Sequence, residues 1–250
     1  MSINEICVFI PARYESKRLP GKPLLKINDK EILLLTYNRV KKIFDKKDIY
    51  ILSSNKIIEY KLKNKIQNII LVKGRYNNGT ERSCAALKII KKKYKAVLII
   101  SCDNPYISLL AIRKTVEVFN KIKNDILYFG STVHKINRIK QEIKNNDIAK
   151  LVVNRNNDVL YISRNIIPNY RKNNKNLYLT HHGPVCIKTE FLKKYLIMKN
   201  TFLQLAEDNE WLKFIEYGYK LKSYGLKNIP IEINSKKDLN YYKKFKNIFR

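Results

Sequence analysis

The chain has 250 residues, 45% hydrophobic and 29% charged, which supplies enough apolar side chain for one large folded domain and excludes a disordered chain. Lys and Arg (51) outnumber Asp and Glu (21), so the formal net charge is +30. No apolar stretch is long enough to span a bilayer, and no basic signal-peptide segment opens the sequence, which excludes an integral membrane protein. We therefore expect a cytoplasmic protein with no membrane partner.

Apolar runs of strand length alternate with helical patterns in the first half of the chain. Strands are predicted at residues 7–10, 49–53, 68–72 and 96–101, and helices at 32–44, 80–92 and 109–121. Further along, the predicted elements are a strand at 125–133, a hairpin of 148–153 with 159–163, an exposed loop at 169–176, a strand at 185–187, helices at 189–196 and 203–217, a strand at 221–224 and a helix at 236–246. This alternation predicts an α/β fold with a mainly parallel sheet, in one domain (1–250) with an inserted region near 134–182.

The cysteines and the excess charge point to no special class. The four cysteines form no C-x-x-C pair and have no histidine at metal-ligand spacing, so reduced thiols are expected. Lysines are spread along the whole chain without a nucleic-acid-binding motif, and Lys, Asn and Ile are abundant together, as a compositional bias would produce. We therefore expect no nucleic-acid partner, although an RNA-binding protein stays an alternative that the charge alone suggests.

The most informative stretch is the loop after the first predicted strand, residues 11–24, which reads Pro-Ala-Arg-Tyr-Glu-Ser-Lys-Arg-Leu-Pro-Gly-Lys-Pro-Leu. It gathers four cations, Arg13, Lys17, Arg18 and Lys22, at the carboxyl end of a strand, where α/β sheets bind ligands. Arginine and lysine suit phosphate oxygens, so the loop predicts a polyphosphate site. The alternative is a solvated basic loop.

This string resembles the opening motif of the bacterial 3-deoxy-manno-octulosonate (Kdo) cytidylyltransferase family, and weaker likeness continues to about residue 240. The resemblance implies a Rossmann-like nucleotide-diphospho-sugar transferase fold, a homodimer with an inserted acceptor and dimerisation region, and Mg²⁺ as cofactor. It implies transfer of CMP from CTP to Kdo, for lipopolysaccharide or surface-glycan synthesis. In the first loop the implied nucleotide-binding residues are Pro11, Ala12, Arg13, Ser16, Lys17, Arg18 and Lys22.

A second motif spans residues 74–82, whose G-x-x-x-x-G spacing mimics a P-loop. Thr80-Glu81 stands where a P-loop needs Lys-Ser/Thr, so that interpretation fails. What remains is a turn leading into a helix, with Asn78 and Thr80 as candidate caps. The motif resembles the family's Ser-Gly-Thr-Glu-Arg, which packs on cytosine, and this implies nucleotide contacts for Asn78, Gly79, Thr80 and Arg82. A helix cap alone is the alternative.

The third motif, Cys102-Asp103-Asn104-Pro105, follows the strand predicted at 96–101. A carboxylate at the end of a buried strand is suited to hold Mg²⁺ against phosphate, although Asp103 could instead be a cap. The motif is similar to the family's Gln-Gly-Asp-Glu-Pro. This gives Asp103 the metal-ligand role, places Cys102 at the nucleotide, and puts Ser101 at the acceptor sugar in place of a glutamine.

The fourth motif precedes the last predicted helix, where the family has Val-Asp-Thr-Pro-Glu-Asp-Leu. Its first Asp, the second metal ligand, corresponds to Asn234, an amide without the charge of a carboxylate. We expect Asp238 to cap the helix. The resemblance also implies acceptor-sugar contacts for Lys150, Arg164, His181 and Glu210.

Together these motifs predict a cytidylyltransferase whose catalytic residues are Arg13, Lys22 and Asp103, with Asp103 and Asn234 as the metal ligands. Charge neutralisation and positioning would let the sugar hydroxyl attack the α-phosphorus and release pyrophosphate. Three alternatives stay open: a different acidic or amino sugar as acceptor, a weakened or inactive homologue because of Asn234, and the RNA-binding protein above.

Overall fold

The computed structural model describes residues 3–15, 18–171, 177–230 and 232–244. Its contacts divide the chain into two compact units, Met1–Leu109 with Pro230–Arg250 (unit 1) and Leu110–Ile229 (unit 2). Each unit is described by itself. The expectation of one domain with an insertion near 134–182 stays a prediction.

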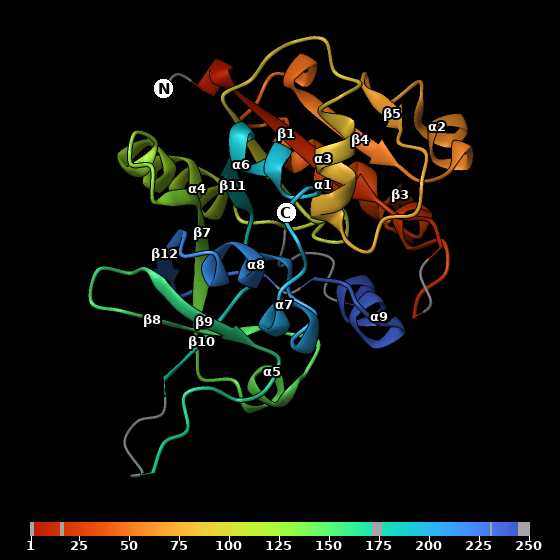
Figure 1. Ribbon diagram of the computed structural model, residues 1–250. Helices are drawn as coiled ribbons and strands as arrows, with labels where there is room; N and C mark the ends of the chain where they lie inside the picture. Colours follow the sequence, from red (N-terminus) through yellow and green to blue (C-terminus); the bar gives the residue numbers. More distant parts are fainter. Residues whose placement is uncertain (1–2, 16–17, 172–176, 231, 245–250) are drawn as a thin grey trace. The chain divides into compact units, whose positions relative to one another are not determined.

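The sheet of unit 1 has four parallel strands (Figure 1). Their order is β5 (Ile69–Leu71), β4 (Ile49–Ser53), β1 (Ile6–Ala12) and β6 (Ala96–Ile99). The run Ile6–Ile10 is completely buried, because a parallel strand covered by helices on both faces needs apolar side chains at every position. The predicted α/β fold with a mainly parallel sheet is confirmed here.

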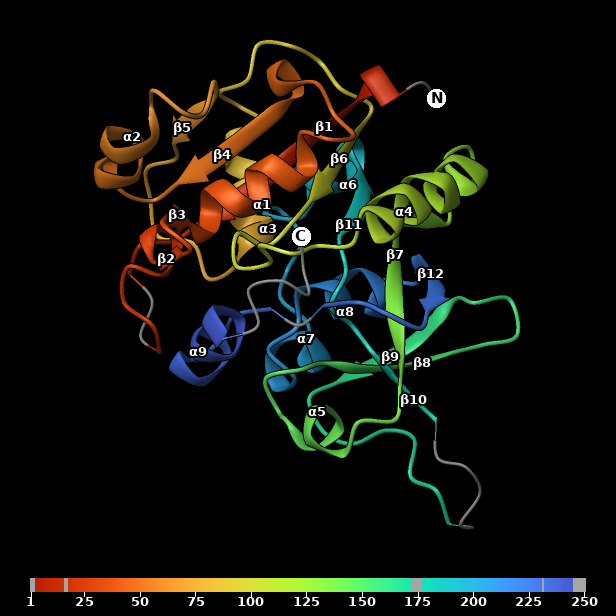
Figure 2. The ribbon, with the colours of Figure 1, turned by 180° about the vertical axis from the view of Figure 1, so that it is seen from behind.

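Helices cover both faces of this sheet. Figures 1 and 2 show α1 (Ile32–Val40) and α3 (Gly79–Ala86) on opposite faces, and α2 (Lys56–Leu62) lies beside β5 at the edge. The remaining elements of unit 1 are the short 3₁₀ turns η1 (Ile3–Glu5), η2 (Lys22–Leu24) and η3 (Lys46–Asp48), the hairpin of β2 (Lys26–Ile27) with β3 (Lys30–Glu31), and α9 (Lys236–Lys244).

Unit 2 is built around the long strand β7 (Tyr128–Asn137). It pairs antiparallel with β11 (Val185–Lys188) and β10 (Tyr178–Thr180), and parallel with β12 (Lys220–Leu226). Beyond β10 lies the antiparallel hairpin of β8 (Lys150–Val153) and β9 (Val159–Ser163). The helices are α4 (Leu109–Ile122), α5 (Lys140–Lys144), α6 (Thr189–Lys194), α7 (Phe202–Ala206) and α8 (Glu210–Glu216).

Most predicted elements are present, and one prediction was wrong. Residues 203–217 form two helices, because Asp208 adopts a left-handed φ of 45° and the Asn209 side chain then caps α8 by accepting from Trp211 N–H. Helix α3 ends at Ala86, short of the predicted residue 92, and α2, α5 and β10 were not predicted. Of the loop expected at 169–176 and the helix expected at 236–246, residues 172–176 and 245–246 lie outside the described residues.

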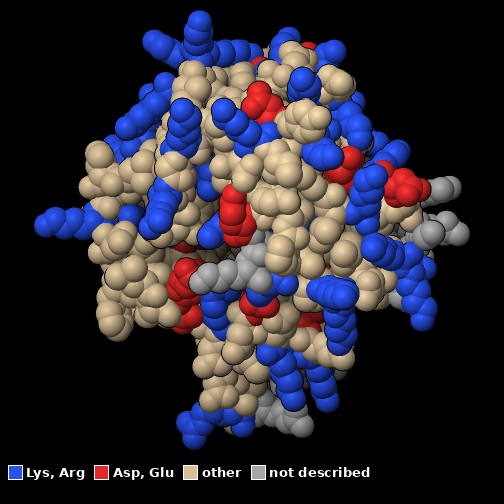
Figure 3. All heavy atoms as spheres, turned by 90° about the vertical axis from the view of Figure 1, so that its right-hand side faces the viewer, with Lys and Arg blue, Asp and Glu red and all other residues tan. Residues whose placement is uncertain are grey.

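The surface and the cysteines agree with the composition. Figure 3 shows Lys and Arg side chains at many separate places on one face rather than in one cluster. All four cysteines are free and buried. Within the described ranges, no helix combines the length and apolar character needed to cross a membrane.

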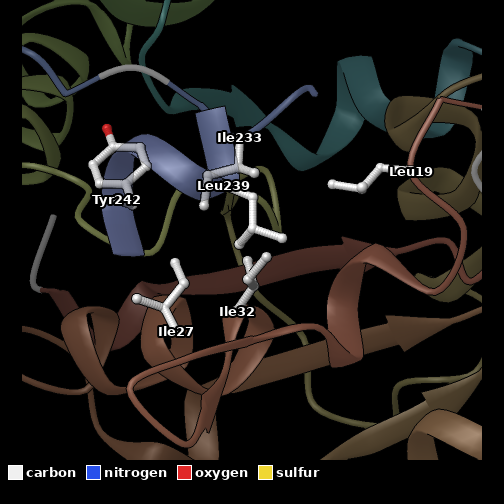
Figure 4. Packing of buried hydrophobic residues seen from close by; sticks show 6 residues of the cluster. All are labelled: Leu19, Ile27, Ile32, Ile233, Leu239 and Tyr242. Atoms are coloured by element: carbon white, nitrogen blue, oxygen red, sulfur yellow. The ribbon is translucent and has the colours of Figure 1, made fainter. Parts of the chain in front are cut away.

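A buried cluster in unit 1 joins the first loop to the C-terminal segment. Its members are Leu19, Ile27, Ile32, Ile233, Leu239 and Tyr242 (Figure 4). The ring of Tyr242 also stacks on Tyr106, with ring centroids 5.0 Å apart. Because Leu19 follows β1 and Ile233 precedes α9, their burial in one cluster brings both segments to the same region of unit 1.

Candidate active site

The first loop starts where β1 ends and is held by its own backbone. Gly21, in the left-handed region with φ 66°, donates its N–H to Tyr14 O at 3.1 Å. The N–H of Tyr14 in turn donates to Ser54 Oγ at 3.2 Å. The Glu15 carboxylate accepts from Ser54 Oγ and Asn55 Nδ2, both at 2.9 Å, and these bonds, that to Asn55 first, lower the pKa of Glu15. The loop is thus tied to the carboxyl end of the neighbouring strand β4.

The cations of this loop occupy different settings. Arg13 and Arg18 are exposed, whereas Lys22, at the start of η2, is largely buried. Ser16 and Lys17, both predicted at the nucleotide, lie outside the described residues. Pro11 is partly exposed and Ala12 is fully buried at the end of β1.

Lys22 forms an ion pair with Asp103, with 2.5 Å between Nζ and Oδ2. The side chains are only 12% and 10% exposed. Burial alone would lower the pKa of Lys22, but the charge of Asp103 outweighs it and the pKa is raised. Two residues predicted to be catalytic are therefore in direct contact.

Backbone contacts fix Asp103 beyond the end of β6. The carbonyl of Cys102 accepts from Thr36 Oγ1 of α1 at 3.0 Å, and the carbonyl of Asp103 accepts from Ile233 N–H at 2.9 Å. The thiol of Cys102 is buried, which raises its pKa to about 12 and leaves it un-ionised. Ser101, predicted at the sugar, is exposed on the same turn.

One carboxylate oxygen at this position fits a cation. In the part of the chain that the structure describes, Asp103 Oδ1 is buried and has no hydrogen-bond partner. A buried carboxylate oxygen without a donor is unfavourable unless a ligand satisfies it. No group of three or more His, Cys, Asp or Glu side chains suited to a metal occurs among the described residues, so water and phosphate oxygens would complete the coordination, as is usual for Mg²⁺.

The second motif begins helix α3 next to the first loop. Of the two predicted caps, Asn78 is confirmed, because Asn78 Oδ1 accepts from Glu81 N–H at 2.8 Å, whereas Thr80 lies inside the helix. Gly79 lies against Pro11, where a Cβ would be 3.2 Å from the proline ring. Thr80 is fully buried and Arg82 is 5% exposed.

Arg82 connects this motif to the first loop electrostatically. Its guanidinium donates to Val72 O at 3.3 Å and lies over the Tyr76 ring, 5.2 Å from the centroid. Burial, and then the neighbouring charge of Arg13, lower the pKa of Arg82. The positive charges of Arg13 and Arg82 thus act on each other, and a bound phosphate would offset this repulsion.

The C-terminal segment adds a residue that the sequence motifs did not single out. Asn234 is partly exposed, and its backbone N–H donates to Asp238 Oδ2 at 3.0 Å. Asp238 also exchanges bonds with Ser235 in a capping box, so its predicted capping role is confirmed. Two residues before Asn234, burial and the charge of Asp103 raise the pKa of Glu232 well above its usual range. The only sequence feature that pointed to Glu232 is that it is a carboxylate two residues before Asn234.

The predicted acceptor residues other than Ser101 belong to unit 2. Lys150 is completely buried, and its ammonium donates to the carbonyls of Asn145 (3.1 Å), Ile148 (2.8 Å) and Arg164. An ammonium has three hydrogens, so these carbonyls use all of its donors. In this structure Lys150 holds the backbone around Arg164.

Arg164 is partly exposed, and its guanidinium donates mainly to backbone carbonyls. It donates to the carbonyls of Glu207 and Asp208, both at 3.0 Å. Glu207, which was not predicted as a site residue, accepts from Ser163 Oγ at 2.7 Å and from Arg164 N–H at 2.8 Å. These bonds organise the end of β9.

His181 and Glu210 have different surroundings. His181 Nε2 lies 2.8 Å from Thr132 Oγ1, and burial lowers the pKa of His181 to about 4, so the ring is neutral at pH 7. Glu210 is partly exposed in the first turn of α8. Contacts of these residues with a sugar stay predictions.

The α/β fold and the cationic first loop suit a nucleotidyltransferase, and comparison with known proteins establishes that class and gives its family. A family model described as cytidylyltransferase matches residues 7–229, and the chain belongs to that family. The 3-deoxy-manno-octulosonate cytidylyltransferase of Fusobacterium nucleatum is 31% identical over 242 residues, which cover 94% of this chain and 95% of that protein. The one of Wigglesworthia glossinidia brevipalpis is 32% identical, covering 96% and 100%. Within the cytidylyltransferases, the chain is thus a member of the 3-deoxy-manno-octulosonate group, as the motifs predicted.

Solved structures confirm the predicted fold. A CMP:2-keto-3-deoxy-manno-octonic acid synthetase complexed with CTP matches 96% of this chain and 98% of its own, with a TM-score of 0.86 at 22% identity. A cytidylyltransferase from Leptospira borgpetersenii matches 96% and 85%, with a TM-score of 0.61 at 16% identity.

Proposed function

We propose that this cytidylyltransferase transfers CMP from CTP to the anomeric hydroxyl of Kdo, giving CMP-Kdo and pyrophosphate. The observation that carries the proposal is the contact between Lys22 and Asp103 at the carboxyl ends of parallel strands, with one Asp103 oxygen unsatisfied. An ammonium and a free carboxylate oxygen at one point suit a triphosphate and its counter-cation. The names of the relatives supply the sugar.

In this proposal the residues of unit 1 bind and orient the nucleotide. Arg13, Arg18 and Lys22 neutralise the triphosphate, while the start of α3, with Asn78 and Thr80, contacts the base. Cys102 packs beside the nucleotide as a small un-ionised side chain. These contacts act through position and charge, which is most of what nucleotidyl transfer requires of a protein.

The reaction balances without a covalent enzyme intermediate. The sugar hydroxyl oxygen forms a bond to the α-phosphorus as the bond from that phosphorus to the bridging oxygen breaks. Pyrophosphate leaves with the bonding electrons, and the hydroxyl proton passes to solvent. Mg²⁺, when bound to Asp103 with Asn234 nearby, supplies positive charge at the α-phosphate and lowers the pKa of the hydroxyl.

The defining experiment measures pyrophosphate release with CTP, Kdo and Mg²⁺, beside reactions without sugar and with UTP in place of CTP. We expect release only with CTP and Kdo together, and a loss of at least about a hundredfold in Asp103→Asn. Matched controls are Glu59→Gln and Glu117→Gln, which remove exposed carboxylates outside the predicted motifs and should leave release unchanged. If the protein binds CTP and releases pyrophosphate with another sugar acid but not with Kdo, the proposed acceptor is wrong and the protein is still a cytidylyltransferase.

We also propose that the protein works as a cytoplasmic homodimer in lipopolysaccharide or surface-glycan synthesis. Exposed apolar side chains around α6 and α7 support an interface: Ile197 is 81% exposed, Phe202 80% and Leu205 63%. Analytical ultracentrifugation should give twice the 29.6 kDa of one chain, and Phe202→Asp should shift it toward the monomer. A monomer at micromolar concentration would refute this assembly.

A further inference from the structure

The Glu207 carboxylate accepts three hydrogen bonds from the end of β9. Tyr161 OH and Ser163 Oγ donate to Oε1 at 3.0 and 2.7 Å, and Arg164 N–H donates to Oε2 at 2.8 Å. Burial alone would raise the pKa of Glu207, but these bonds, that from Arg164 first, outweigh it, and the pKa is lowered. Glu207 is therefore an ionised side chain that is bonded to three residues at the end of β9.

The backbone of Glu207 holds the side chain of the same arginine. Arg164 Nε donates to Glu207 O, and Arg164 Nη2 donates to Asp208 O, both at 3.0 Å. Glu207 thus fixes the main chain of Arg164 through its carboxylate and the side chain through its carbonyl. Because Asp208 has the left-handed φ that separates α7 from α8, the guanidinium is bonded to the break between these helices.

The other edge of this guanidinium has only long contacts. Nη1 lies 3.4 Å from Asn146 O and 3.5 Å from Asp147 O, and Nη2 lies 3.5 Å from Asp208 Oδ2. Hydrogen bonds of that length are weak, and the Arg164 side chain is 38% exposed, so a ligand can reach it and replace them. The Nη1 and Nη2 groups together suit a carboxylate, which would accept two short, charge-assisted bonds.

We propose that Glu207 is a positioning residue for the acceptor sugar acid, because it orients Arg164 so that the Nη1 and Nη2 edge meets the carboxylate of the sugar. The proposal rests on the proposed function for the sugar acid as substrate. Both Glu207 oxygens accept from protein donors, so Glu207 acts through Arg164 and does not itself contact the substrate. The competing explanation is that the three bonds only stabilise unit 2.

The test measures pyrophosphate release by the full chain, first with Kdo varied at saturating CTP and then with CTP varied at saturating Kdo. We expect Glu207→Ala to raise the KM for Kdo at least about tenfold and the KM for CTP less than about twofold, because the CTP contacts proposed above belong to unit 1. Glu207→Gln keeps an oxygen for Arg164 N–H, so it should raise the KM for Kdo by only about threefold. Arg164→Ala with Glu207→Ala should raise it no further than Arg164→Ala alone, since Glu207 then has no guanidinium to orient.

The matched control is Glu216→Ala, at the opposite end of α7. The Glu216 carboxylate accepts from the N–H groups of Leu203 and Gln204, both at 3.1 Å, so it also holds backbone in unit 2. Glu216→Ala should lower the melting temperature, as Glu207→Ala does, but leave the KM for Kdo within about twofold of wild type. Hydrogen exchange of residues 161–166 adds a measurement that does not depend on activity, and it should become faster in Glu207→Ala and not in Glu216→Ala.

A KM for Kdo within twofold of wild type in folded Glu207→Ala would overturn the proposal. An equal rise in Glu216→Ala would also overturn it, because that would be a general effect of destabilising unit 2. If Glu207→Ala does not fold, Glu207→Gln decides in the same way, and an unchanged KM for Kdo there refutes the positioning role. If wild type releases no pyrophosphate with Kdo, the proposed function fails instead, and the exchange comparison still shows whether Glu207 holds the end of β9.

Discussion

Replacing Asp103 by asparagine should destabilise the protein in the absence of any ligand. The substitution keeps the volume of the side chain and removes its charge, which leaves the Lys22 ammonium largely buried beside a neutral amide. At the 2.5 Å separation, and with an effective dielectric constant of about 20, the attraction between the two charges is about 7 kcal/mol. Most of that offsets the cost of taking both groups out of water.

Breaking a buried pair from one side costs about 3–5 kcal/mol. The charge of Glu232, which also contributes to the raised pKa of Lys22, keeps part of the stabilisation of the ammonium after this change. We therefore expect about 3 kcal/mol for Asp103→Asn. The exposed pair of Lys114 and Glu117 has a similar distance, 2.6 Å, but its side chains are 29% and 46% exposed, so Glu117→Gln should destabilise the protein far less than Asp103→Asn.

Urea unfolding followed by circular dichroism measures both changes, with Trp211 fluorescence as a second probe because Trp211 is the only tryptophan and is buried in unit 2. Lys22→Met with Asp103→Asn should cost less than the sum of the single changes by at least about 1.5 kcal/mol. Equal destabilisation by Asp103→Asn and Glu117→Gln would refute the reasoning, since it would mean that burial of the pair adds nothing.

Three further predictions concern unit 2. Burial lowers the pKa of His134 to about 4, so below pH 6.5 the unfolded chain binds a proton that the folded chain does not. Stability should fall between pH 6.5 and 4, and since the pKa values of His181 and His182 are lowered in the same way, His134 should account for only about 2 kcal/mol of the fall at pH 5, the part that His134→Gln should remove when urea midpoints are compared. Gly130→Ala would place its Cβ 2.4 Å from the backbone oxygen of Cys186, so we expect a loss of at least about 3 kcal/mol by thermal unfolding; a normal melting temperature would refute it. Lys150→Met should cost about 3 kcal/mol, because three carbonyls lose their donor, while the KM for Kdo of the folded enzyme stays within threefold; an increase of tenfold or more at unchanged stability would instead support sugar contact.

Local pattern was enough to predict the framework of unit 1. Strand β4 has its predicted bounds, 49–53, because a short apolar run there meets polar residues at both ends. The break between α7 and α8 was missed because the helical period continues across it, and only the left-handed backbone of Asp208 ends the first helix. Neither pattern nor motif could reveal that carbonyls would occupy all donors of the Lys150 ammonium. Two of these carbonyls belong to the loop directly before β8, whose backbone path the sequence does not specify, and the third follows the end of β9.

Prediction of the candidate active site from the sequence had the same limit. Motifs name residues by type and spacing, so they found Lys22 and Asp103, which lie 81 residues apart and are in contact in the structure. They assigned the second metal ligand to Asn234 by its place in a pattern. Chemistry at a cation site depends instead on where charge is delivered in space, and in an extended segment the positions two residues apart face the same side.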